Sequence, residues 1–197
     1  MGLGRDTIVR AALALLDDVG LDGLTLRRLA DELDVQAPAL YWHVKNKAEL
    51  LHDMAAAIVH DALHDLEAPR RGESWVDWTA DCAHRLRDAM RTHRDGARVL
   101  SGTYLTHLSG RPLELALRTL CDAGFSARDA ARGIGTVFSY VQGFTVEEQS
   151  TPQPPVDATR FPLAAHAVTE LTHNPDARFE HGLRLLLSGL RLSRFGG

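Results

Sequence analysis

Residues 25–47, TLRRLADELDVQAPALYWHVKNK, decide the fold of this chain. The first part of the stretch has apolar side chains at helical spacing, namely Leu26, Leu29, Ala30 and Leu33. Thr25 can cap that helix, and Asp34 tolerates the left-handed backbone conformation that a tight turn requires. Pro38 suits the first turn of a second, short helix, where its missing N–H costs nothing. The stretch therefore predicts a helix-turn-helix.

Polar, basic and aromatic side chains gather on the second helix of this motif, which we expect to span about Gln36 to His43 and to face solvent. An exposed helix with such side chains is what contacts to DNA phosphates and base edges require. We therefore predict DNA-binding residues at Thr25, Arg27, Gln36, Ala37, Pro38, Tyr41, Trp42, His43, Lys45 and Lys47. Arg27 is expected at a base edge, because a guanidinium suits O6 and N7 of guanine. The alternative is a helical hairpin in an ordinary α-bundle, with its aromatic side chains packed inside.

The rest of the chain has helical periodicity and no long strand-like alternation, which predicts an all-α protein. Asn46 and Glu49 form a capping box for a helix that starts at 47. In order, the expected helices lie over about 6–19, 47–64, 75–94, 112–124, 126–149, 161–172 and 176–194. The clearest break in the pattern is at 69–72. We divide the chain into a helix-turn-helix domain at 1–47, a connecting helix at 48–69 and a helical domain at 70–197.

The composition is that of an ordinary globular protein, with 197 residues, 45% of them apolar, and a formal net charge of −4. Because this charge is negative, DNA binding would depend on a local basic face and not on the charge of the whole chain. No apolar run approaches the roughly 20 residues that span a bilayer, and the first residues lack a signal-peptide pattern. Cys82 and Cys121 suggest no disulfide framework. We expect a cytoplasmic protein with no membrane partner.

The segment LYWHVKNKAELL at 40–51, preceded by DGLTLRRLADELDV at 22–35, closely resembles the DNA-binding domain of the TetR (tetracycline repressor) family. GESW at 72–75, RDGARV at 94–99 and AGFSARDA at 123–130 resemble the tetracycline-repressor branch of that family. The resemblance implies an N-terminal helix-turn-helix domain and a C-terminal helical domain for ligand binding and dimerisation. It also implies a homodimeric repressor that binds a palindromic double-stranded DNA operator and is released by a small-molecule effector.

The last expected helix carries an apolar stripe formed by Phe179, Leu183, Leu186, Leu187 and Leu190. The resemblance implies that this helix and the one over 128–149 form half of a four-helix dimer interface. Three glycines in the longer helix would permit close helix approach, namely Gly133, Gly135 and Gly143. The alternative is that the stripe is buried within one subunit.

In the tetracycline-repressor branch, inducers bind in a pocket between the central helices. The resemblance implies ligand contacts at His64, Cys82, Leu86, Leu100, Thr103, Tyr104, Leu113, Ala116, Ile134, Phe138 and Glu147. Leu100 stands where the branch has its metal-binding imidazole, and Cys82 and Leu86 replace an amide and an aromatic residue. We therefore expect an effector other than a magnesium–tetracycline complex. It should be largely apolar and aromatic, with His64 and Glu147 as polar handles.

Other chemistries have less support in the sequence. His60 and His64 are four residues apart on one expected helix and could bind a metal ion. No G-x-S-x-G, Walker-type loop or H-E-x-x-H sequence occurs. We predict no enzyme, no catalytic residue, no metal and no cofactor. Two rivals remain: a DNA-binding regulator of the same fold without an effector, and a helical enzyme that uses the pocket.

Overall fold

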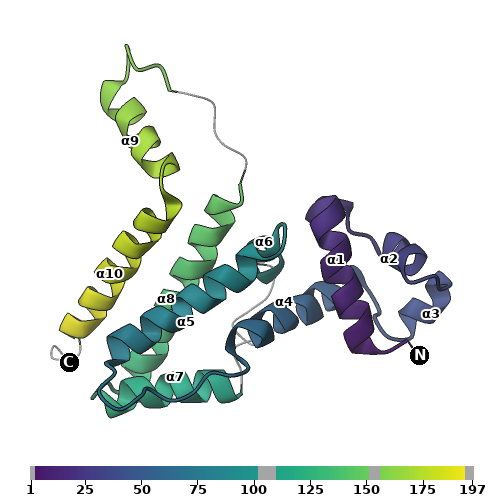
Figure 1. Cartoon of the computed structure of the whole chain (residues 1–197), viewed down its shortest axis with the longest axis horizontal. Helices are drawn as coiled ribbons and strands as arrows, with labels where there is room; N and C mark the ends of the chain where they lie inside the picture. Colours follow the sequence, from purple (N-terminus) through teal and green to yellow (C-terminus); the bar gives the residue numbers. More distant parts are fainter. Residues whose placement is uncertain (1–2, 102–109, 151–155, 194–197) are drawn as a thin grey trace.

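The computed structural model describes residues 3–101, 110–150 and 156–193, and throughout these ranges the regular structure is α-helical (Figure 1). This confirms the predicted all-α fold. The described helices are α1 (Arg5–Gly23), α2 (Leu26–Glu32), α3 (Ala37–Tyr41), α4 (Lys47–Leu63), α5 (Trp75–Arg91), α6 (Gly96–Ser101), α7 (Arg111–Asp122), α8 (Ala127–Glu148), α9 (Pro162–Thr172) and α10 (Pro175–Ser193). None of them is long and apolar enough to cross a membrane.

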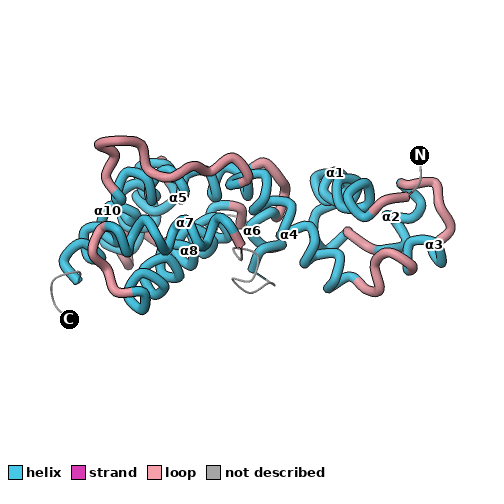
Figure 2. The backbone as a smooth tube through the Cα atoms, turned by 90° about the horizontal axis from the view of Figure 1, so that it is seen from below, coloured by secondary structure: helices cyan, strands magenta, loops and turns pink. Residues whose placement is uncertain are grey.

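Helices α1, α2 and α3 form a head at one end of an elongated molecule, and α4 runs from this head into the body (Figures 1 and 2). Helix α1 packs against both α2 and α4. The interior of the head is made of fully buried side chains, which include Ile8, Leu16, Leu29, Leu40 and Val44. The same apolar cluster continues along α4 into the body. Head and body therefore share one core, with α4 as its link.

Two turn signals that the sequence predicted are present in the head. Thr25 Oγ1 accepts a hydrogen bond from the backbone N–H of Arg28 at 3.2 Å, which caps α2. Asp34 takes the left-handed conformation between α2 and α3, with φ of 50°. Helix α1 is kinked at Gly20, whose φ of 69° lies outside the helical range. A short helical turn follows the kink and ends at Gly23. Helix α3 has 5 residues, which is shorter than predicted.

The junction between head and body is fixed by the cap of α4. Asn46 Oδ1 accepts the backbone N–H of Glu49 at 2.9 Å, as predicted. The predicted return bond of the capping box is wrong, because the Glu49 carboxylate accepts the backbone N–H of Lys45 at 2.9 Å. The other oxygen of this carboxylate accepts from Arg5 at 2.7 Å. Glu49 therefore reaches past the cap residue to join α4 to the start of α1.

The body consists of α5 to α10 (Figure 1). Helix α5 packs against α4 and α8, and α7 and α10 each pack against α8. Serine caps start α5 and α8, as the sequence predicted. Ser74 Oγ accepts the backbone N–H of Asp77, and Ser126 Oγ accepts that of Asp129, each at 3.1 Å. These helices enclose the site described below.

The apolar side chains of α10 divide between two faces. Phe179, Leu183 and Leu187 are buried within the subunit. This corrects the assignment of the whole stripe to a dimer interface, because α8 of the same chain lies against α10. Leu185 and Leu192 point outward instead, with exposed fractions of 60% and 78%. The free apolar face of α10 is therefore a different one from the predicted stripe.

A buried ion pair ties α5 to α8. The Arg87 side chain is 4% exposed and donates two hydrogen bonds to the Glu148 carboxylate, at 3.0 and 2.8 Å. The same guanidinium lies 4.6 Å from the ring centroid of Phe179 and 2.7 Å from Asp176 Oδ1 on α10. Three helices of the body therefore meet at one arginine.

Candidate DNA-binding surface and effector cavity

The head presents the end of α3 to solvent. Trp42, the residue after α3, is 89% exposed, and Tyr41 is 51% exposed. Large aromatic side chains at the surface are typical of interaction sites. The alternative in which these rings pack inside an α-bundle is therefore wrong. Arg27 on α2 is also exposed and has no ion pair within the described ranges.

The remaining predicted DNA positions surround α3. The exposed ones are Thr25, Gln36, Pro38 and Lys45, and the half-buried ones are Ala37, His43 and Lys47. Lys47 differs from expectation, because its Nζ donates to the backbone carbonyl oxygen of Leu21 at 2.9 Å. One of the three ammonium donors is thus committed to the contact between α4 and α1. Lys47 has a structural role in addition to any contact with phosphate.

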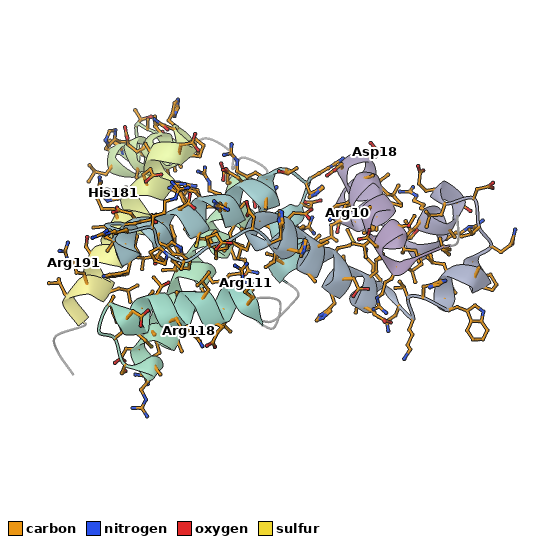
Figure 3. The ribbon with its side chains drawn as sticks, turned by 60° about the horizontal axis from the view of Figure 1, so that its bottom comes forward. Arg10, Asp18, Arg111, Arg118, His181 and Arg191 are labelled. Atoms are coloured by element: carbon orange, nitrogen blue, oxygen red, sulfur yellow. The ribbon has the colours of Figure 1, made fainter. Side chains whose placement is uncertain are left out.

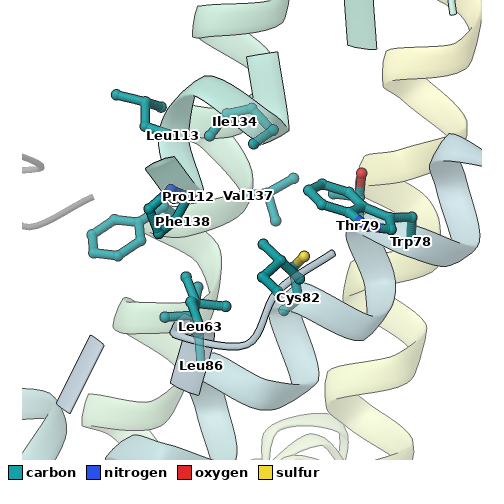
Figure 4. Close-up of a pocket in the computed structure, with 13 residues that line it drawn as sticks. Leu63, Trp78, Thr79, Cys82, Leu86, Pro112, Leu113, Ile134, Val137 and Phe138 are labelled. Carbon is teal, nitrogen blue, oxygen red and sulfur yellow. The ribbon is translucent and has the colours of Figure 1, made fainter. Parts of the chain in front are cut away.

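An apolar cavity lies in the body between the end of α4 and helices α5, α7 and α8 (Figure 4). Its described lining is Leu63, Leu66, Trp78, Thr79, Cys82, Ala83, Leu86, Pro112, Leu113, Ala116, Ile134, Val137 and Phe138. None of these side chains is normally charged at neutral pH. The volume of this cavity is about 50 Å³. A dry cavity of about 150 Å³ is the size that holds benzene, so a ligand must push this lining apart or extend beyond it.

The polar atoms of Thr79 and Trp78 in the lining form hydrogen bonds within the protein, and the thiol of Cys82 is uncharged. Thr79 Oγ1 donates to the Trp75 carbonyl oxygen at 2.7 Å, and Trp78 Nε1 donates to that of Glu67 at 2.9 Å. Burial raises the pKa of Cys82 to about 12, so its thiol is neutral at physiological pH. The described lining of the cavity therefore offers apolar contact and no charge.

Several predicted ligand positions meet at this cavity, namely Cys82, Leu86, Leu113, Ala116, Ile134 and Phe138. The sequence prediction missed Leu63, Leu66, Ala83 and Pro112. It also missed three further residues on α5 and α8, namely Trp78, Thr79 and Val137. Each lies three or four residues from a predicted position on the same helix, and such neighbours share one helix face. The helical spacing of α5 and α8 could have identified all three.

Other predicted ligand positions lie elsewhere. Glu147 is on the outer surface with its side chain 66% exposed, and it pairs with Arg178 of α10 at 2.9 Å. Glu147 therefore does not line the described part of the cavity in its own subunit, and its role as a polar handle stays a prediction. It follows Phe138 by nine residues, which is about half a turn around the axis of α8. Leu100 on α6 is 1% exposed and belongs to the main core. Thr103 and Tyr104 lie outside the described residues.

His64 lies in a groove that adjoins the cavity. This groove of about 340 Å³ is lined by Ala56, Val59, His60, Leu63, His64, Arg111 and Pro112. Leu63 and Pro112 also line the cavity, so they stand between the two spaces. His64 and Arg111 are therefore at the outer mouth of the apolar site. Sequence reasoning missed Arg111, which follows His64 by 47 residues in the chain.

His60 and His64 lie close together, and Asp61 Oδ1 is 3.6 Å from His60 Nδ1. Their rings stack with centroids 5.2 Å apart. His64 Nδ1 lies 3.2 Å from the carbonyl oxygen of His60. Within the described ranges, no group of three or more His, Cys, Asp or Glu side chains is placed to hold a metal ion.

The head is a helix-turn-helix, and one helix joins it to an α-helical body that contains an apolar cavity. This architecture defines a class of regulators in which one chain carries both a DNA-binding domain and an effector-binding domain. The family described as "Bacterial regulatory proteins, tetR family" matches residues 8–54. The one described as "Tetracyclin repressor-like, C-terminal domain" matches residues 68–194. The chain belongs to the TetR family of bacterial regulatory proteins.

Individual relatives match over nearly the whole chain. Tetracycline repressor protein class C of Escherichia coli is 37% identical over 203 residues, which cover 98% of this chain and 92% of the relative. A crystal structure of TetR-Q116A from Acinetobacter baumannii AYE in complex with minocycline is 35% identical, with a TM-score of 0.80 and coverage of 98% and 99%. BioQ, crystallised with its double-stranded DNA operator, is 34% identical, with a TM-score of 0.72 and coverage of 96% and 98%.

Proposed function

We propose that this chain is a ligand-responsive transcriptional repressor that binds a double-stranded DNA operator through its head. The exposure of Trp42 and Tyr41 beside α3 carries the proposal, in a family whose members include a named repressor and a protein crystallised with its operator. Arg27 contacts a base edge in this proposal, and Thr25 and Tyr41 contact phosphates. A regulator of this family needs no catalytic residue, and we propose none.

Helix α4 can transmit the effector signal, because it touches both functional regions. Its first residue, Lys47, binds the carbonyl of Leu21 in the head, and its last residue, Leu63, lines the cavity. A molecule that widens the cavity displaces Leu63 and His64, swings α4 and moves the head. To release the protein from DNA, the effector must bind the conformation that does not bind DNA more tightly than the one that does. A hundredfold preference corresponds to about 2.7 kcal/mol.

A second copy of the chain is the proposed partner of the outward face of α8 and α10. Leu185 and Leu192 are exposed there. A Cβ added to Gly143 on α8 or Gly189 on α10 would meet no atom within 4 Å, so both helices can be approached closely. A two-fold dimer places two α3 helices about one turn of DNA apart, which fits a palindromic operator.

The proposed effector is not a magnesium–tetracycline complex, although the relatives include tetracycline repressors. Mg²⁺ needs well-placed oxygen ligands. Leu100 offers none, and the Glu147 carboxylate is turned towards Arg178. Titration of the purified protein with tetracycline and Mg²⁺ is the test. Submicromolar, magnesium-dependent binding that releases operator DNA would overturn this part of the proposal.

Fluorescence anisotropy with labelled DNA from upstream of the protein's own gene tests the function as a whole. Specific binding is expected, and Trp42→Ala should weaken it while leaving the helical circular dichroism unchanged. The absence of binding to any such fragment would refute a repressor. The small cavity favours one second candidate, a regulator of the same fold without an effector. A screen of apolar aromatic compounds that releases no DNA would support that candidate.

A further inference from the structure

We propose that the effector is an anion with an apolar aromatic body, and that Arg111 recognises its charge. This inference rests on the proposed function, because it assigns the chemistry of the molecule that enters the same site. The cavity lined by Cys82 and Leu86 takes the uncharged body. The groove outside it takes the anionic group, next to Arg111 and His64.

The distribution of charge along the site separates these two roles. No described residue of the cavity lining is charged, so burying an ionised group there would be costly. The ionisable side chains of the described groove lining are His60, His64 and Arg111. The nearest carboxylates, Glu67 at 3.3 Å from Arg111 and Asp61 at 3.6 Å from His60, are not among the described lining residues. A negative group is therefore favoured at the groove over the cavity.

Arg111 can exchange its present partner for a ligand at small cost. Its Nη2 lies 3.3 Å from Glu67 Oε1, and both side chains are exposed, at 59% and 83%. Exposed ion pairs of this kind contribute little to stability. The nearby carboxylate of Glu114 pairs with Arg118 at 2.9 Å. Arg118 lies further along α7 than Arg111 (Figure 3). A guanidinium at the groove is thus accessible to an incoming anion.

The start of α7 adds to this preference. Arg111 is the first residue of the helix, so the positive end of the helix dipole faces the same groove. The two adjoining spaces also fit a molecule larger than a single ring. The cavity has about 50 Å³ and the groove about 340 Å³, which together reach the lower part of the range for small-molecule sites.

Two dyes with the same aromatic body test the proposal on free protein, without DNA. Anilinonaphthalene sulfonate is anionic, and N-phenylnaphthylamine lacks the sulfonate. Fluorescence titration of wild type and Arg111→Gln gives four affinities. The substitution should weaken sulfonate binding about tenfold to a hundredfold, the range of a lost hydrogen bond between charged groups. It should leave the neutral dye unaffected, which also shows that the variant is folded.

Two control variants make the result specific. Arg118→Gln changes an exposed arginine on the same helix and should alter neither affinity. Ala116→Leu fills the cavity and should weaken both dyes. Equal effects of Arg111→Gln on the two dyes, or dye binding that Ala116→Leu does not weaken, would overturn the proposal. If the wild-type protein binds no operator DNA but its preference for the anionic dye still depends on Arg111, the proposed function is wrong and the ligand assignment stands.

Discussion

Arg87→Met removes a charge from the junction of α5, α8 and α10 and keeps an unbranched side chain in its place. The Arg87 side chain is 4% exposed, and that of its partner Glu148 is 11% exposed. After the substitution, the nearest cation to Glu148 is Arg91, at 3.5 Å. Because a buried carboxylate that has lost its main partner is costly, we expect the free energy of unfolding to fall by about 3–5 kcal/mol.

The contacts of Arg87 show where this loss arises. Burial opposes its charged form, yet the hydrogen bonds to Glu148 and Asp176 outweigh burial and raise the pKa of Arg87 above its ordinary value. Asp176 contributes little to stability, since its side chain is 70% exposed. The contact with the Phe179 ring adds about 0.5–2 kcal/mol. Most of the loss therefore comes from the pair with Glu148.

Urea unfolding followed by far-ultraviolet circular dichroism measures the effect. All variants must be compared at one protein concentration, because association changes apparent stability. Arg85→Met is the matched control, two residues earlier on α5. Its bonds to Asp65 at 3.0 Å and Asp81 at 2.8 Å are exposed, so we expect a loss of at most about 1 kcal/mol.

The double variant Arg87→Met with Glu148→Met completes the test. It removes both buried charges, so it should be more stable than Arg87→Met alone. Equal losses in Arg85→Met and Arg87→Met would refute the reasoning. A double variant no more stable than the single one would refute it as well.

Further substitutions test other parts of the molecule. Arg27→Ala should cost about 1–3 kcal/mol in operator affinity and reduce sequence preference, measured by anisotropy on operator and random DNA. Lys47→Ala should lower the melting temperature as well as DNA affinity, because its ammonium also holds a backbone carbonyl of α1. Burial raises the pKa of Cys82 to about 12, so at about pH 8 iodoacetamide should label it far more slowly in native protein than in urea-unfolded protein, as read by mass spectrometry. The burial of Asp95 is outweighed by its hydrogen bonds, among them the one from the Leu21 N–H, and the pKa of the Asp95 carboxyl group is therefore lowered. Wild type should therefore differ in stability from Asp95→Asn at neutral pH, and this difference should vanish as acid protonates the carboxylate.

Local signals explain why much of the fold could be predicted from the sequence. The caps at Thr25, Asn46, Ser74 and Ser126 each join a side chain to a backbone N–H three residues later, so both partners stand in one short segment. The stripe on α10 was different. Its periodicity predicts a buried face, but periodicity does not say which helix, in which subunit, covers that face.

The candidate site was predicted in part, for a related physical reason. Positions on one helix face follow from each other, so Cys82 and Leu86 lead to the α5 side of the cavity. The partners of Glu147 and His64 come from distant segments. Glu147 is bound by Arg178, and His64 shares its groove with Arg111. Such pairings depend on how helices pack, and no spacing within one helix predicts them.

The head is joined to the body by two connections of different physical character. Helix α4 shares a continuous apolar core with both parts, and this core resists deformation. The contacts between α1 and residues 94–98, which are the turn before α6 and the start of α6, are polar and near the surface. Asp22 pairs with Arg98 at 3.2 Å, and Asp17 accepts the backbone N–H of Arg94 at 2.8 Å. Exposed polar contacts are individually weak and can re-form elsewhere. In the proposed mechanism, a ligand that displaces Leu63 would move α4 as a rigid lever, and the contacts of α1 with residues 94–98 would set the resistance that the ligand's differential affinity has to overcome.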